Sequence, residues 1–157
     1  MKQITTDNLL QLSDTAAHAA RLRANVNFHP ELNDPVQRLA IAMEPGTYIR
    51  PHRHPHTFEL LLPLRGRFIV LNYDDEGTVI RRVVLGEECA VLEMPANTWH
   101  SVLSLDHQGV IFEVKQGGYQ PIAEQDFMSW APAEGQPGTQ QLIAWYSKAN
   151  VGDRYPG

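Results

Sequence analysis

The 157-residue chain has 43% hydrophobic and 20% charged residues, which is typical of one globular domain and excludes a disordered chain. Its formal net charge of -5, from 13 Lys and Arg against 18 Asp and Glu, argues against a nucleic-acid partner, because phosphate binding needs clustered basic residues. The single cysteine, Cys89, excludes an internal disulfide framework, and no signal peptide or membrane-length apolar run is visible, so we expect a cytoplasmic protein without a membrane partner.

The first 35 residues predict one helix and a polar connector. Leucines and alanines recur at helical spacing between residues 6 and 23, and Thr6 or Asp7 can cap the N-terminus of this helix. Residues 25–35 are polar and rich in asparagine, which is typical of a connector. We expect residues 1–35 to pack against the rest of a single domain.

Residues 36–115 show a different pattern, with short β-branched and aromatic runs separated by turn residues. The clearest hairpin has the turn Asp74-Asp75-Glu76-Gly77 between two such runs. Regular short strands predict a β-sandwich or small barrel rather than an α/β fold. We expect strands over residues 37–43, 47–54, 57–62, 66–73, 78–85, 89–94, 98–104 and 109–115.

Residues 116–157 are predicted to cover this barrel. The part up to residue 140 is rich in Gly, Pro and Gln, which favours an irregular segment. Apolar residues return between Leu142 and Tyr146, and we expect one last strand or a short packed turn there.

Two histidines in the middle of the chain are spaced as metal ligands would be. His52 and His54 are two residues apart in a segment expected to be extended, where alternate side chains point to the same side. Glu59 follows a short turn, and His100 follows the turn Pro95-Ala96-Asn97. Three neutral imidazoles and one carboxylate suit a divalent transition metal with coordination positions left open. We therefore predict one ion bound by His52, His54, Glu59 and His100.

The identity of the metal stays open at this stage, since these ligands accept zinc, iron, nickel, manganese or copper. A solvated polar turn is the competing interpretation of the same residues. His56 shares the strand parity of His52 and His54 and is an alternative ligand, although Pro55 can interrupt the strand there.

The segment from Gly46 to Gly66 resembles the first motif of the cupin superfamily. The second motif is looser: the spacing from Pro95 to His100 fits, whereas Asn97 and Ser104 stand where glycine and asparagine are common. The residues at the spacing of the first motif are Gly46, His52, His54, Glu59 and Gly66.

More narrowly, nearly the whole chain from about residue 23 resembles the WbuC-type cupin-fold metalloproteins. The segments RPHRHPH, DDEG, PANTWH, FEVKQGGYQP and SWAPAEG carry this resemblance. It implies an all-β double-stranded β-helix (jelly-roll) barrel with an N-terminal helix, one metal ion held by the four predicted ligands, and a link to surface-polysaccharide gene clusters. It implies no reaction, because a fold is a poor guide to activity.

Strand parity adds candidates around the metal. If His52 faces the interior, Tyr48 and Arg50 face it too; Tyr48 is then a candidate acid or base, and Arg50 suits an anionic substrate group. Glu113 and Lys115 share one face of the last predicted strand. On the inner face, Glu113 would be an acid or base and Lys115 an anion contact.

Aromatic residues of the irregular segment are expected to close the barrel mouth. Packing is one interpretation of Tyr119, Phe127 and Trp130, and contact with a sugar ring is the other. We take Tyr119 and Trp130 as candidate substrate contacts.

The run Phe58–Leu62 is apolar on both faces, so the face turned away from the core needs a cover. The N-terminal helix or a second subunit can supply it, and we expect a homodimer.

Two classes of function remain open. The first is a metal-dependent enzyme acting on a small polar molecule such as a sugar or nucleotide sugar, with a non-haem iron dioxygenase as one variant. The second is a non-catalytic, metal-dependent sensor of a small molecule. Two ionisable groups converging on the open coordination positions would favour the enzyme.

Overall fold

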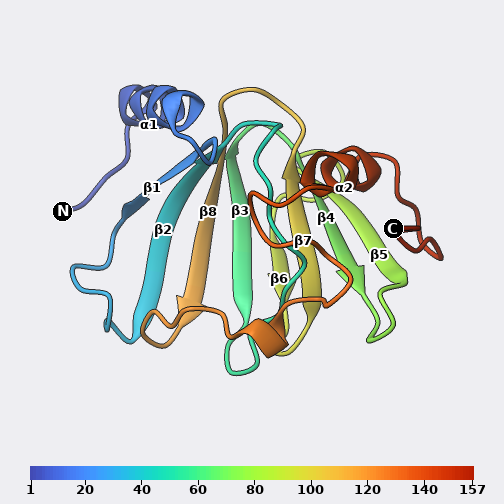
Figure 1. Cartoon of the computed structure of the whole chain (residues 1–157). Helices are drawn as coiled ribbons and strands as arrows, with labels where there is room; N and C mark the ends of the chain where they lie inside the picture. Colours follow the sequence, from blue (N-terminus) through green and yellow to red (C-terminus); the bar gives the residue numbers. More distant parts are fainter.

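A computed structural model describes residues 1–157 and contains two antiparallel sheets, with a helix near each end of the chain (Figure 1). One sheet has five strands in the order β1-β2-β8-β3-β6, and the other has three in the order β5-β4-β7. The elements are α1 (Thr6–His18), β1 (Arg23–Asn27), β2 (Val36–Met43), β3 (Glu59–Arg65), β4 (Phe68–Tyr73), β5 (Val79–Leu85), β6 (Leu92–Met94), β7 (Trp99–Ser104), β8 (Gly109–Gln116), η1 (Glu124–Asp126) and α2 (Thr139–Tyr146).

The two sheets face each other across a hydrophobic core. Alternate residues of each strand point to this core, as the two-residue period of a strand requires. Phe68 and Val70 of β4 meet Leu61 of β3 and Ile111 of β8 there, and all four are almost fully buried. This arrangement confirms the predicted all-β jelly roll with an N-terminal helix.

Helix α1 packs on the outer face of the five-stranded sheet, over β1 and β2 (Figure 1). Ala16 of the helix contacts Ala40 and Ala42 of β2, and these small side chains let the helix approach the sheet closely. The helix is capped by Thr5, one residue before the predicted caps. It ends five residues earlier than predicted, because Ala19 is extended and the chain turns into β1, a strand that we did not expect in the connector.

The predicted strand over residues 47–54 is wrong. Residues 44–58 form no regular strand and make only isolated bridges at His52. Pro45, Pro51 and Pro55 lack the backbone N–H that a strand ladder needs. The strand expected from residue 57 therefore begins at Glu59 and continues to Arg65.

The C-terminal apolar run forms helix α2 instead of the expected strand or short packed turn. Leu142 and Tyr146 lie four residues apart, so both fall on one helical face, and both are fully buried. They pack with Leu71 and Leu103 against the side of the three-stranded sheet that faces away from the first core. The residues after β8 thus form a second core on this sheet. Neither helix is long and apolar enough to cross a membrane.

Candidate metal centre

The backbone of His52 is held on both sides although it lies outside any strand. Its N–H donates to the carbonyl of His100 at 2.9 Å, and the His100 N–H donates back at 2.8 Å. On the other side His52 forms a bridge with Phe127, and the Met128 N–H donates to Pro51 at 2.9 Å. Strand β7 and the segment after η1 therefore position the loop of the two histidines.

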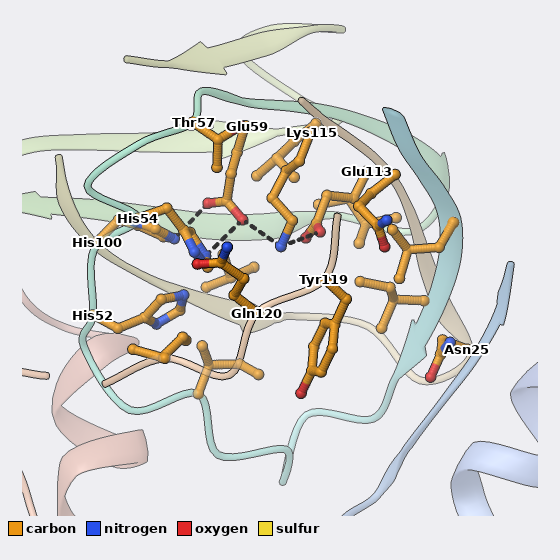
Figure 2. A pocket seen from close by; sticks show the side chains of 18 of the residues that line it. Asn25, His52, His54, Thr57, Glu59, His100, Glu113, Lys115, Tyr119 and Gln120 are labelled. Carbon is orange, nitrogen blue, oxygen red and sulfur yellow. Dashed lines mark ion pairs between the residues drawn. The ribbon is translucent and has the colours of Figure 1, made fainter. Parts of the chain in front are cut away.

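Four side chains converge at this point, as predicted: His52, His54, Glu59 and His100 (Figure 2). Their ligand atoms all lie within 4.8 Å of one another. The Glu59 carboxylate lies between two of the histidines, with Oε1 at 3.1 Å from His54 Nε2 and Oε2 at 2.7 Å from His100 Nε2. His56, the alternative ligand, is exposed and lies outside this group.

Two of the imidazoles have their tautomer set by the backbone. Nδ1 of His52 donates to the Arg50 carbonyl at 2.8 Å, and Nδ1 of His100 donates to the Thr98 carbonyl at 3.0 Å. In the neutral ring, Nε2 then carries a lone pair directed at the centre, which is what a metal ligand requires. A proton on His100 Nε2 makes the 2.7 Å hydrogen bond to Glu59 Oε2, and a divalent ion would take the place of that proton. These residues fit one divalent ion.

Burial and neighbouring charges shift the pKa values of His52, Glu59 and His100 in different directions. Burial, with the nearby charge of His100, lowers the pKa of His52 well below its usual value, so His52 is neutral. Burial alone would raise the pKa of Glu59, but the His100 charge and the hydrogen bonds with His100 and His54 hold it well below its usual range. Burial opposes the charged form of His100 as well, yet Glu59 raises its pKa overall. The carboxylate is therefore ionised and matched to a cation.

A cavity of about 540 Å³ opens beside these ligands, which is an ordinary size for a small-molecule site. Glu113 and Lys115 of β8 both line this cavity. Their shared face of the strand is therefore the inner one, as their predicted roles beside the metal require. Lys115 Nζ lies 2.8 Å from Glu113 Oε1 and 3.4 Å from Glu59 Oε1 (Figure 2). A carboxyl group, an ammonium group and the metal ligands thus share one wall of the cavity.

The pKa values of Glu113 and Lys115 on β8 are both raised. Burial raises the pKa of Glu113, as does the negative charge of Glu59, and Lys115 only partly offsets this. Burial would lower the pKa of Lys115, but the charges of Glu113 and Glu59 outweigh it and raise the pKa. Glu113 therefore keeps a proton to a higher pH than an exposed glutamate.

Three candidate residues lie elsewhere. Tyr48 is buried in the second core and donates to the Pro132 carbonyl at 2.7 Å. Arg50 donates to the Ala131 carbonyl and stacks over Phe127, and Trp130 packs against Gly77. Tyr48 and Arg50 do not face the same side as His52, because the loop before His52 is not a strand and its side chains do not alternate.

Tyr119 lines the cavity as expected, and its neighbour Gln120 points toward the metal ligands (Figure 2). Sequence reasoning missed Gln120, and it also missed Asn25 and Gln37, which line the cavity from β1 and β2. Nothing in the sequence around these three amides distinguishes them from surface residues.

Arg53, between the two loop histidines, ties them to η1. Its Nε lies 2.9 Å from Oδ1 of the buried Asp126. The guanidinium group also stacks over the ring of Trp99, with its Cζ 4.4 Å from the ring centroid. Its backbone N–H donates to the Asp126 carbonyl at 3.0 Å. Asp126 therefore acts on the ligands through Arg53.

Comparison with known proteins identifies the fold. The family model described as Domain of unknown function (DUF6016) matches residues 4–85, more than half of the chain. No curated protein matches the chain. CapF, solved with the inhibitor 3-isopropenyl-tropolone, is 16% identical, with a TM-score of 0.56 over 66% of this chain and 30% of that one.

Two further solved structures are similar. BH2720 from Bacillus halodurans is 15% identical, with a TM-score of 0.51 over 78% of this chain and 86% of that one. Oxalate oxidase in complex with glycolate is 18% identical, with a TM-score of 0.51 over 67% of this chain and 55% of that one. The chain therefore spans less than a third of CapF and about half of oxalate oxidase. At this identity the likeness shows the cupin fold alone.

Replacing Asp126 tests its action on the metal ligands. Asp126→Asn keeps the side-chain size and the backbone acceptor but removes the charge that holds Arg53. We expect metal affinity, measured by competition with a chromogenic chelator, to fall about 10- to 100-fold, as for other residues that orient metal ligands.

The matched control is Glu124→Gln, since Glu124 pairs with Arg50 and its side chain is 80% exposed. Its metal affinity should stay at the wild-type value. A lower melting temperature of Asp126→Asn with unchanged metal affinity would mean that Asp126 serves the fold only.

Proposed function

The chain belongs to the DUF6016 family, whose description assigns no activity, and we propose its function from the metal centre itself. We infer that the protein is a metal-dependent enzyme that acts on a small polar molecule in the cavity. The observation that carries this proposal is the pair Glu113 and Lys115, which faces the same cavity as the four ligands. A sensor needs no such ionisable pair beside its metal.

We assign the ion to His52, His54, Glu59 and His100, one per chain, as zinc, iron, nickel or manganese. A divalent ion there would polarise an oxygen atom of the bound molecule. Glu113 is the group that gives or takes a proton, because burial raises its pKa toward neutrality. Lys115 holds negative charge that develops on the bound molecule.

A sugar or nucleotide sugar is the substrate class that we propose. The amides of Asn25 and Gln120 line the cavity and can bind hydroxyl groups, and the half-exposed ring of Tyr119 lies at the same cavity. Resemblance to the WbuC-type proteins adds the link to surface-polysaccharide metabolism, and the single cysteine suits a cytoplasmic protein.

Metal content tests the centre directly. Elemental analysis of untagged protein should find one transition-metal ion per chain, and chelator should remove it. Glu59→Gln should lose the ion, because the amide has no charge for it, while circular dichroism stays native since none of the four ligands belongs to the hydrophobic core between the sheets.

His56→Ala is the matched control, because His56 is an exposed histidine of the same loop outside the group. Full occupancy in both variants would contradict the ligand assignment. Iron in the wild-type protein would direct the search to oxygen-dependent reactions, and zinc, nickel or manganese to reactions without oxygen.

Glu113→Gln tests the acid or base. A ligand is first found by screening sugars and nucleotide sugars for those that raise the melting temperature of the metal-loaded protein. Glu113→Gln should bind it with a similar Kd but lower kcat by about 100-fold or more, since general acid–base catalysis contributes that much. Turnover at the wild-type rate would show that Glu113 has no such role.

We also propose a homodimer through the outer face of β3 and β8. Leu60 and Leu62 of β3 point away from the core beside Val114 and Phe112 of β8, and all four are only half-buried. Helix α1 lies over the other end of this sheet (Figure 1). A second copy would cover the remaining apolar face.

Light scattering at micromolar concentration should give twice the 17.7 kDa chain mass. Leu62→Glu should give the monomer, because it places a charge in the interface. Ile80→Glu, at an exposed position of the other sheet, should remain dimeric. A monomeric wild-type protein would refute the dimer.

A further inference from the structure

Two arginines that line the cavity form an ion cluster with one glutamate outside its lining. Arg21 precedes β1 and Arg23 begins it, and both contribute to the cavity lining. The carboxylate of Glu134 accepts from both guanidinium groups: Oε1 lies 2.8 Å from Arg21 Nε and 3.0 Å from Arg23 Nη1, and Oε2 lies 3.2 Å from Arg23 Nη2. We call these three residues the rim cluster.

The rim cluster has one positive charge in excess. Two guanidinium groups share a single carboxylate, so Glu134 neutralises only one of them. Arg23 is held in place independently, because Nη1 also donates to the Tyr48 carbonyl at 2.9 Å and its side chain is only 19% exposed. An anion with more charge than a carboxylate would match the pair better.

The backbone between the two arginines is strained. Leu22 has a φ of +53°, a left-handed conformation that branched side chains rarely adopt. It is held there by its carbonyl, which accepts from the Glu44 N–H at 3.0 Å and from Thr47 Oγ1 at 2.5 Å. The Leu22 side chain occupies the space that a Cβ at Gly46 would need. This turn brings both guanidinium groups to one carboxylate, and strain of this kind is common at binding sites.

We propose that Arg21 and Arg23 form a phosphate subsite, and that Glu134 occupies it when no ligand is bound. A phosphate dianion has the charge to neutralise both arginines, and its oxygens can accept two hydrogen bonds from each planar guanidinium group. Glu134 lies in the segment between Pro132 and Gly138, which has no regular structure, so the carboxylate can be displaced without breaking a strand or helix.

The subsite narrows the substrate class. Because the same cavity reaches the metal ligands, a molecule with its phosphate at the rim cluster would extend its other end toward Lys115 and the centre. Phosphorylated sugars and nucleotide sugars have this form, whereas free sugars do not. This last step rests on the proposed function; the phosphate subsite itself does not.

Calorimetric titration with inorganic phosphate tests the subsite on the protein as purified. Arg21→Gln removes an exposed side chain whose ion-pair partner is Glu134, and it should weaken phosphate binding at least tenfold with an unchanged melting temperature. Arg23→Gln should weaken it similarly. Glu134→Gln should strengthen it severalfold, because the competing carboxylate is gone.

Arg81→Gln is the control, as Arg81 is exposed on β5 and outside the cavity, and it should bind like the wild type. Glu59→Gln, with the metal centre disabled, should retain phosphate binding. Binding lost in Glu59→Gln but kept in Arg21→Gln and Arg23→Gln would place phosphate on the metal and refute the subsite while supporting the metal centre. No binding to the wild type, or equal binding to the wild type and all arginine variants, would also refute it.

Discussion

Backbone hydrogen bonds on both sides of His52 are the constraint on which the metal centre depends. Three prolines keep the loop out of any regular strand, so its position comes from β7 on one side and from the segment around Phe127 on the other. That segment is 75 residues away in the sequence, and Asp126 within it also binds Arg53. The C-terminal part of the chain is therefore a structural component of the site and not only a cover for the barrel.

The unequal width of the two sheets explains where the cavity opens. β1 and β2 extend the first sheet beyond the span of the three strands opposite, and no residue of β4 or β5 lines the cavity. Inner-face residues of β1 and β2 consequently line the cavity, and only the end of β2 at Met43 joins the core. The exposed Asn25 is tolerated there because water or a ligand can satisfy it, whereas the buried Gln37 donates to the Leu32 and Asp34 carbonyls.

Charge is distributed in the cavity so that an anionic molecule is favoured at both ends. The buried carboxylates of Glu59 and Glu113 are offset by Lys115, and a divalent ion would add positive charge next to them. At the rim, two arginines share one carboxylate. An anionic ligand would complete the pairing at each end.

The residue pattern alone predicts an all-β sandwich or small barrel and four metal ligands, and the resemblance to the cupin motifs adds the jelly roll. The fold class follows from alternation within strands and the glycine at the hairpin turn. The ligands follow from the spacing of the histidines and Glu59, although the loop of the two histidines is not a strand. Tertiary structure decided that Tyr48 and Arg50 face away, because prolines break the strand parity that would have turned them inward. It also decided that the C-terminal run is a helix and that Arg21 and Arg23 meet Glu134. Contacts between segments more than 70 residues apart depend on how the sheets curve and pack, and no local pattern records that.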